Sequence, residues 1–204
     1  MHNRKILIIG EVYVDQHLDI IENGYSTSRL GGIFHAARSC DALNIEYALA
    51  YYAPDYLVKD VEKFGIDVLR ASSIFRLGKV DKAPNVMLIG QSDESGNQLY
   101  ENILGRQAEY VSMLPFMQVL DDFDPTDIII FPGRYGNAGI LSNLSNYEGK
   151  IHIDMNYDCD DILDLDTIKI QTVFLSTSST SFEEFFKEIS YDNFCLLYTS
   201  PSPR

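Results

Sequence analysis

Asp15, the second of two carboxylates near the start of the chain, has the residue type and the placement to bind the hydroxyl groups of a small ligand. Glu11 and Asp15 follow a short apolar run, Ile6 to Ile9, that Gly10 ends. The run is rich in β-branched residues, as in a strand buried on both faces of a parallel sheet. A carboxylate just past such a strand can accept hydrogen bonds from two hydroxyl groups, although aspartate is also common in turns and caps.

A glycine pair, Gly31-Gly32, supplies the second part of this candidate site. It opens a segment whose apolar residues recur at helical spacing: Ile33, Phe34, Ala37, Cys40 and Leu43. The pattern predicts a helix whose N-terminal backbone N–H groups face outward. Residues without side chains would let a ligand approach the backbone closely, while a helix-start turn that needs positive φ would use the same pair.

The elements that must position these residues alternate between strand and helix patterns. We predict further strands at 47–52, 127–131, 150–154 and 172–175, and helices at 54–64, 110–120, 135–144 and 182–189. Residues 66–77 hold one or two strands, Gly65 is predicted to stop the helix before them, and 86–90 with 98–103 form a hairpin. The alternation implies βαβ units and an α/β fold with a mostly parallel central sheet flanked by helices.

Polar or glycine residues stand at the C-terminal ends of four of the predicted parallel strands. They are Gly10-Glu11, Gly133, Asp154 with Asn156, and Ser176-Thr177. Ligands of open α/β sheets bind in the crevice outside those ends. We therefore expect these residues to converge on one edge of the sheet.

Composition narrows the class of protein and its partners. The length of 204 residues favours one domain, and the net charge of −14, from 30 acidic and 16 basic residues, argues against nucleic acid or an anionic membrane as a partner. We expect neither a signal peptide nor a membrane span, because the apolar runs are of strand length. Three cysteines without C-x-x-C spacing predict a reducing cytoplasm and no zinc site.

The order of these motifs resembles the N-terminal portion of the ribokinase-like, or PfkB, carbohydrate kinases. The resemblance rests on G-E-x-x-x-D at Gly10 to Asp15, followed by L-G-G at Leu30 to Gly32 and a helix of small residues, and it runs from Lys5 to Ile189. It implies a ribokinase-like domain over residues 1–194. A small β lid would be formed by strands within roughly 12–30 and 83–104.

The resemblance also implies roles for individual residues. In that family the aspartate binds sugar hydroxyls, the glycine pair lies against the sugar, and an asparagine usually follows a few residues later. His35 occupies that region here, either as a replacement donor or as an ordinary helix histidine. Two hairpin residues would face the sugar from the lid, although an exposed polar edge would look the same. The implied substrate-binding set is Asp15, Gly31, Gly32, His35, Asn102 and Arg106.

The phosphoryl-transfer region is only partly matched. Asp154 and Asn156 are similar to a family D-x-N after a central strand, and a carboxylate capping the following turn is the alternative. The family's N-x-x-E is not preserved, which leaves the displaced Glu183 and Glu184 as metal candidates. No G-A-G-D, the segment that carries the family's catalytic base, occurs in the chain.

The resemblance therefore implies a fragment of an ATP-dependent sugar kinase that uses Mg²⁺. With the base missing, the chain alone is expected to be inactive. A nucleoside kinase of the same superfamily and a non-catalytic sugar- or nucleotide-binding module remain alternatives, whereas a dinucleotide-binding oxidoreductase lacks its G-x-G-x-x-G. The expected partner is a small-molecule sugar, and a homodimer through the lid is compatible with the resemblance.

The last ten residues, 195–204, do not fit the alternating pattern. They form a polar, proline-bearing tail where another strand is expected, and permissible codons for this peptide spell the end of a sequencing adapter. We interpret residues 195–204 as a non-native tail, with a natural disordered C-terminus as the alternative.

Overall fold

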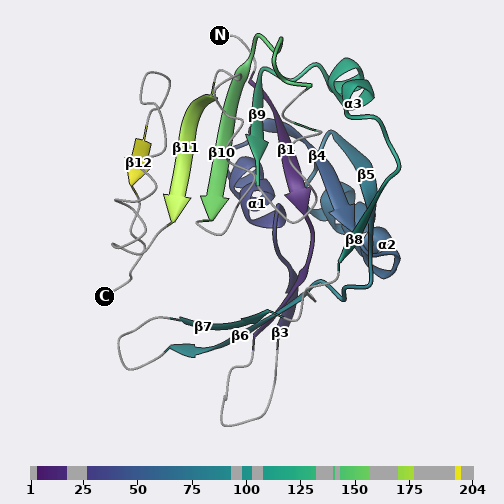
Figure 1. The fold of residues 1–204 in the computed structure, drawn as a ribbon, viewed down its shortest axis with the longest axis vertical. Helices are drawn as coiled ribbons and strands as arrows, with labels where there is room; N and C mark the ends of the chain where they lie inside the picture. The colour runs from purple at the N-terminus through teal and green to yellow at the C-terminus, as the bar shows by residue number, and fades with distance from the viewer. Residues whose placement is uncertain are drawn as a thin grey trace.

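The computed structural model describes residues 4–17, 27–92, 98–102, 108–131, 140, 143–156, 170–176 and 196–198 of the 204-residue chain. These residues form two sheets with three α-helices (Figure 1). None of the helices in this part of the chain has the length and apolar character needed to cross a membrane.

The larger sheet has eight strands in the order β12-β11-β10-β9-β1-β4-β5-β8. The strands are β1 (Lys5–Glu11), β4 (Glu46–Ala53), β5 (Ser73–Asp81), β8 (Glu109–Ser112), β9 (Asp127–Ile130), β10 (Lys150–Asn156), β11 (Ile170–Ser176) and β12 (Leu196–Tyr198). All neighbours in it are parallel except β5 and β8, so the predicted mostly parallel α/β sheet is confirmed.

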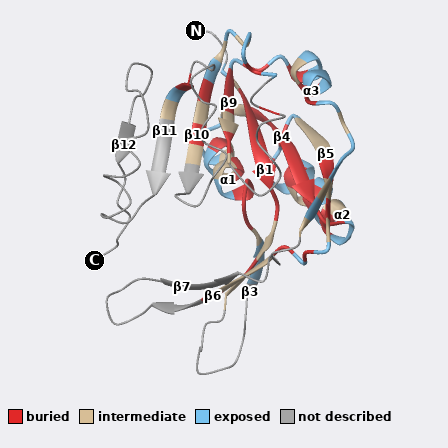
Figure 2. Cartoon of the chain, in the orientation of Figure 1, coloured by how far each residue is buried: buried red, intermediate tan, exposed pale blue. Residues whose placement is uncertain are grey.

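Alternate residues of the central strand pack into two hydrophobic cores, one on each face of the sheet. Leu7 and Ile9 of β1 belong to the core that contains Phe116 and Val119 of α3 (Phe116–Phe123). Ile6 and Ile8 belong to the opposite core, with α1 (Phe34–Ala42) and α2 (Val58–Lys63). Strand residues alternate between faces, so a continuous apolar run is what a strand covered on both sides requires. Figure 2 shows that β1 and β4, at the centre of the sheet between these two cores, are buried.

The second sheet has four strands in the order β3-β2-β6-β7. They are β2 (Val14–His17), β3 (Thr27–Leu30), β6 (Val86–Ser92) and β7 (Gln98–Asn102), and β6 with β7 forms the predicted antiparallel hairpin. This small sheet lies beyond the arrowheads of β1, β9, β10 and β11 in Figure 1. Its strands fall within the residues predicted to form a lid, and the lid function itself remains a prediction.

Two helix predictions need correction. The prediction over 110–120, which noted a helix start near Pro115, holds only after that proline: β8 pairs Tyr110 with Val80, and the helix begins at Phe116. Gly65 does not stop the helix before it, because a 3-10 turn (Asp55–Leu57) and α2 continue into a π-helical turn, Phe64–Val68. A Cβ at Gly65 would lie 2.5 Å from Cδ1 of Ile74, so this glycine serves close packing against β5.

The remaining strand predictions agree with the structure, with shifts at their ends. β4, β9, β10 and β11 match the predicted strands, and the region 66–77 contributes only the start of β5. Leu43 is 70% exposed because α1 ends at Ala42, before this residue could join the buried face. The helices predicted at 135–144 and 182–189 lie mostly or wholly outside the described residues.

The segment 195–204 departs from its prediction in one respect. Leu196–Tyr198 forms β12, which pairs in parallel with β11 from Val173 to Leu175. The three residues of β12 are the apolar part of the segment, which is why they can extend the sheet. A strand therefore does follow β11 here, and the non-native origin of the segment remains a prediction.

Candidate functional site

The C-terminal end of β1 is where the strand order of the large sheet reverses. After β1 the chain builds β4 and β5 on one side, and it later adds β9, β10 and β11 on the other. Ligands of open α/β sheets bind outside such a switch point. The segment after β1 leads into β2 of the small sheet, and Gly31-Gly32 leads from β3 back to α1 (Figure 1). Four predicted site residues lie on these two connections and the elements they join: Asp15, Gly31, Gly32 and His35.

Asp15 is the most deeply buried carboxylate among the described residues, at 2% exposure. On β2 it pairs across the ladder with Arg29 of β3, whose Nε lies 3.4 Å from Asp15 Oδ2. The same Oδ2 lies 3.1 Å from Nε2 of His35, which reaches it from the first turn of α1. The structure thus brings Asp15 and His35 together, as predicted for a shared site, and adds Arg29, which the sequence analysis missed.

The glycine pair is required by two close approaches. A Cβ at Gly31 would lie 2.2 Å from Asp15 Oδ1, so the carboxylate packs on the bare Cα of this glycine. Gly32 has a φ of +63°, and a Cβ there would lie 2.1 Å from the carbonyl oxygen of Glu11. Only glycine meets both demands without strain. The positive-φ turn is therefore confirmed at Gly32, whose close contact is with the Glu11 carbonyl oxygen, and the approach of a ligand to this backbone stays a prediction.

Charge balance keeps Asp15 ionised. Burial alone raises its pKa, but the hydrogen bond and charge of His35, followed by those of Arg29, outweigh it, so the pKa of Asp15 lies below its usual range. The next cation along the helix is Arg38, whose Nη2 donates to the Leu30 carbonyl oxygen at 2.8 Å. Burial and the charge of Arg29 lower the pKa of Arg38, while Asp15 opposes that change.

A second buried polar network joins the large sheet to the small one. Asn85 is fully buried with φ at +48°, and its Nδ2 donates to the Val12 carbonyl oxygen at 3.0 Å and to Glu11 Oε2 at 3.3 Å. Tyr110 of β8 donates its hydroxyl to Glu11 Oε1 at 2.7 Å. The backbone of Asn85 also accepts from the Val14 N–H at 2.9 Å. These hydrogen bonds hold in place the two chain segments that connect the sheets, one just before β2 and one just before β6.

Asp154 lies at the predicted edge but inside its strand. β10 extends through Asn156, so neither residue stands in a loop after the strand. Burial raises the pKa of Asp154. β9 separates β10 from β1, so Asp154 belongs to the same C-terminal edge as Glu11 without sharing a strand pair with β1.

Several predicted site residues fall outside what can be placed. Arg106, Glu183, Glu184, Gly133 and Thr177 lie beyond the described residues, and Asn102 and Asn156 are placed as backbone only, in β7 and β10. Within the described ranges, no three His, Cys, Asp or Glu side chains converge as metal ligands would.

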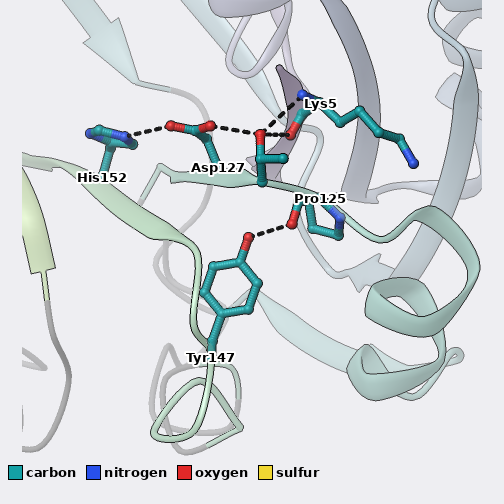
Figure 3. A network of polar contacts seen from close by, with 6 residues as sticks. Lys5, Pro125, Asp127, Tyr147 and His152 are labelled. Carbon is teal, nitrogen blue, oxygen red and sulfur yellow. Dashed lines mark hydrogen bonds and ion pairs between the residues drawn. The ribbon is translucent and has the colours of Figure 1, made fainter. Parts of the chain in front are cut away.

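A separate polar cluster lies at the opposite edge of the large sheet (Figure 3). Asp127, the first residue of β9, accepts from the Thr126 hydroxyl at 2.7 Å and lies 3.4 Å from Nε2 of His152. Tyr147 donates to the Pro125 carbonyl oxygen at 2.8 Å, and burial with nearby aspartate charge raises the pKa of Tyr147 to about 12. Because these residues surround the N-terminal ends of the strands, we assign the cluster a structural role.

Solved structures of kinases are similar to this chain. An uncharacterized sugar kinase from Pyrococcus horikoshii is 12% identical with a TM-score of 0.57, covering 90% of this chain and 66% of its own. A nucleoside kinase of the ribokinase family from Methanocaldococcus jannaschii is 13% identical with a TM-score of 0.56, covering 93% and 65%. Ribokinase from Giardia lamblia is 14% identical with a TM-score of 0.57, covering 94% and 67%. No protein-family model and no curated protein matches the sequence.

The sheet order, the switch point and the small sheet define an α/β protein with a ligand edge at the carboxyl ends of its strands. The similar structures identify that architecture: the chain has the ribokinase-like fold. The resemblance found in the sequence is thereby confirmed at the level of the fold. The chain spans about two thirds of the length of these proteins.

Proposed function

We propose that this chain is the acceptor-binding portion of a phosphotransferase that moves the γ-phosphoryl group of ATP to a hydroxyl group of a sugar. The observation that carries the proposal is Asp15, a buried carboxylate packed on Gly31 just beyond the switch point of the large sheet. A carboxylate held in place at such a point can orient a polyhydroxy ligand, directly or through the side chains that it holds. The small sheet would cover that ligand and exclude water.

The predicted substrate-binding residues and the phosphate-region residues each have a role in this proposal. Asp15, Gly31, Gly32 and His35 would form the acceptor side, and Asn102 and Arg106 would approach from the small sheet. Asp154 and Asn156 would lie toward the transferred phosphoryl group. ATP is the proposed donor, which fits the ATP complex known for the similar sugar kinase of Pyrococcus horikoshii. Mg²⁺, when bound, would neutralise phosphate charge.

The chain itself is proposed to be inactive, because its sequence contains no G-A-G-D segment to supply the base. A nucleoside acceptor is the second candidate, favoured by the similarity to the Methanocaldococcus jannaschii nucleoside kinase. A non-catalytic binding module would also account for the missing base. All three would use the same proposed acceptor site and differ in ligand and turnover.

Two assays separate these functions. The purified chain is titrated calorimetrically with hexoses, pentoses and nucleosides, and ATP-dependent phosphorylation is measured for this chain and for the protein encoded by the gene after long-read resequencing across the codon of Phe194. We expect sugar binding by the chain and phosphorylation only by a longer product that carries G-A-G-D. Turnover by the 204-residue chain would contradict the assignment of the base, and tighter nucleoside than sugar binding would favour the second candidate.

A further inference from the structure

The buried carboxylate at the proposed acceptor site does not itself face the solvent. The Asp15 side chain is 3% exposed, with Oδ1 against Gly31 and Oδ2 engaged by Arg29 and His35. Those two partners are 49% and 50% exposed. A ligand would therefore first contact Arg29 and His35, whose positions are held by the buried Asp15 carboxylate.

Arg29 has donors left over for a ligand. It approaches Asp15 through Nε, and its two terminal nitrogens have no partner among the described residues. A guanidinium presents those nitrogens as a planar fork that fits a phosphate or carboxylate with two parallel hydrogen bonds. His35 uses Nε2 toward Asp15 and adds positive charge when it is protonated.

Among the described residues of this cluster, two arginines and one histidine accompany a single carboxylate. Arg29, His35 and the nearby Arg38 surround Asp15, and Nη1 of Arg38 is buried without a hydrogen-bond partner in the part of the chain that the structure describes. Elsewhere among the described ion pairs the numbers balance. Arg70 pairs with Asp41, and Arg76 and Lys79 share Asp55 and Asp81.

This local surplus is notable because the chain as a whole carries a formal charge of −14. A general negative field disfavours anions over most of the surface, so an anion would be held where positive side chains are concentrated. A neutral sugar hydroxyl can also accept from a guanidinium, but an anionic substituent gains stronger hydrogen bonds, because donor and acceptor are then both charged.

We propose that the acceptor carries an anionic group, a phosphate monoester or a carboxylate, and that Arg29 and His35 contact that group directly. Asp15 is the counter-ion that holds both side chains in place. The inference rests on the proposed function, since it names the substrate class of the same site. It is tested by binding, which needs no turnover.

The first test uses inorganic phosphate as the probe and the imidazole signals of the chain in NMR as the readout. The sequence has four histidines, and His35→Gln assigns the signal of His35. We expect phosphate to shift this signal, and Arg29→Gln to weaken phosphate binding by about fivefold or more through loss of a charge-assisted contact. Arg70→Gln is the matched control, because Arg70 is an exposed arginine paired with Asp41 away from the cluster. A His35 signal that phosphate leaves unmoved, or equal weakening by both arginine variants, would overturn the inference.

The second test compares neutral hexoses and pentoses with their monophosphates and with hexuronates by calorimetry. We expect the anionic member of a matched pair to bind about tenfold tighter, and the advantage to be lost in Arg29→Gln. Tighter phosphates than uronates would identify a phosphate ester, and the reverse order a carboxylate. Equal or tighter binding of the neutral sugars would refute the anionic acceptor while leaving the sugar kinase proposal intact. Phosphate that binds at His35 with no sugar of any kind binding would count against the proposed function instead.

Discussion

Gly31→Ala is the substitution whose effect follows most directly from the geometry of the site. The new Cβ would start 2.2 Å from Asp15 Oδ1. An ordinary contact begins at 3.4 Å, about 1.2 Å farther, so the carboxylate or the helix start must shift. Asp15 cannot easily retreat, because β2 is held between β3 and β6. We expect a loss of about 2 kcal/mol, as for other overpacked sites, which lowers the melting temperature by about 4–8 °C in a chain of this size.

A double-mutant cycle in thermal and chemical denaturation tests that reasoning. In an Asp15→Ala background the obstructing carboxylate is gone, so Gly31→Ala should cost less than about 0.5 kcal/mol, and the coupling between the two sites should be about 1.5 kcal/mol. The same penalty for Gly31→Ala in both backgrounds would refute the clash with Asp15. Gly32→Ala should remain destabilising in either background, since its positive φ and its contact with the Glu11 carbonyl oxygen do not involve Asp15.

Four further predictions concern polar groups around the site. Asn85→Ala should cost about 3 kcal/mol in urea denaturation, because buried acceptors lose their donor and alanine disfavours positive φ. Tyr110→Phe should cost about 1.5–3 kcal/mol, measured the same way, through the lost bond to the Glu11 carboxylate. The pKa of Asp15 is lowered in the folded protein, so its ionised form stabilises the fold at pH values above 3.8, and this stabilisation is lost as the pH falls through the folded-state pKa. In thermal unfolding measured below pH 4, Asp15→Asn should abolish that loss. The pKa of Asp154 is raised, so Asp154→Asn should raise the melting temperature at pH 7.

Two outcomes would contradict these predictions. A stability of Asn85→Ala within about 0.5 kcal/mol of the parent would mean that this network does not fix the crossings between the sheets. An acid-side melting profile that is identical with and without Asp15 would mean that His35 and Arg29 do not hold its charge.

Local pattern was sufficient to predict the large sheet. The run from Ile6 to Ile9 is continuous and β-branched, and such a run can be satisfied only by a strand with apolar cover on both faces. The polar residues after it therefore had to lie at the carboxyl edge, which placed Glu11 correctly. The glycine pair could be interpreted in the same way, because only close approach or positive φ explains two adjacent glycines before a helix.

The features that could not be predicted from the sequence depend on contacts between residues far apart along the chain. Tyr110 looked helical because its neighbours are apolar, but its strand is decided by pairing with β5 and by the Glu11 carboxylate. Arg29 carried no signal of its own, since its role follows from standing opposite Asp15 in a ladder whose register the sequence did not fix. Gly65 was misjudged because its close neighbour is Ile74 in the following strand.

The central claim is that Asp15 forms the acceptor site of a ribokinase-like fold, and one titration tests it most directly. Hexoses, pentoses, their monophosphates and nucleosides are titrated into the chain, into Asp15→Asn, and into Asp41→Asn as the control for a carboxylate outside the site. We predict that at least one of these ligands binds the chain and that Asp15→Asn weakens its binding by about tenfold or more, while Asp41→Asn leaves it unchanged. Binding that Asp15→Asn does not alter, or no binding by any member of the panel, would contradict the account.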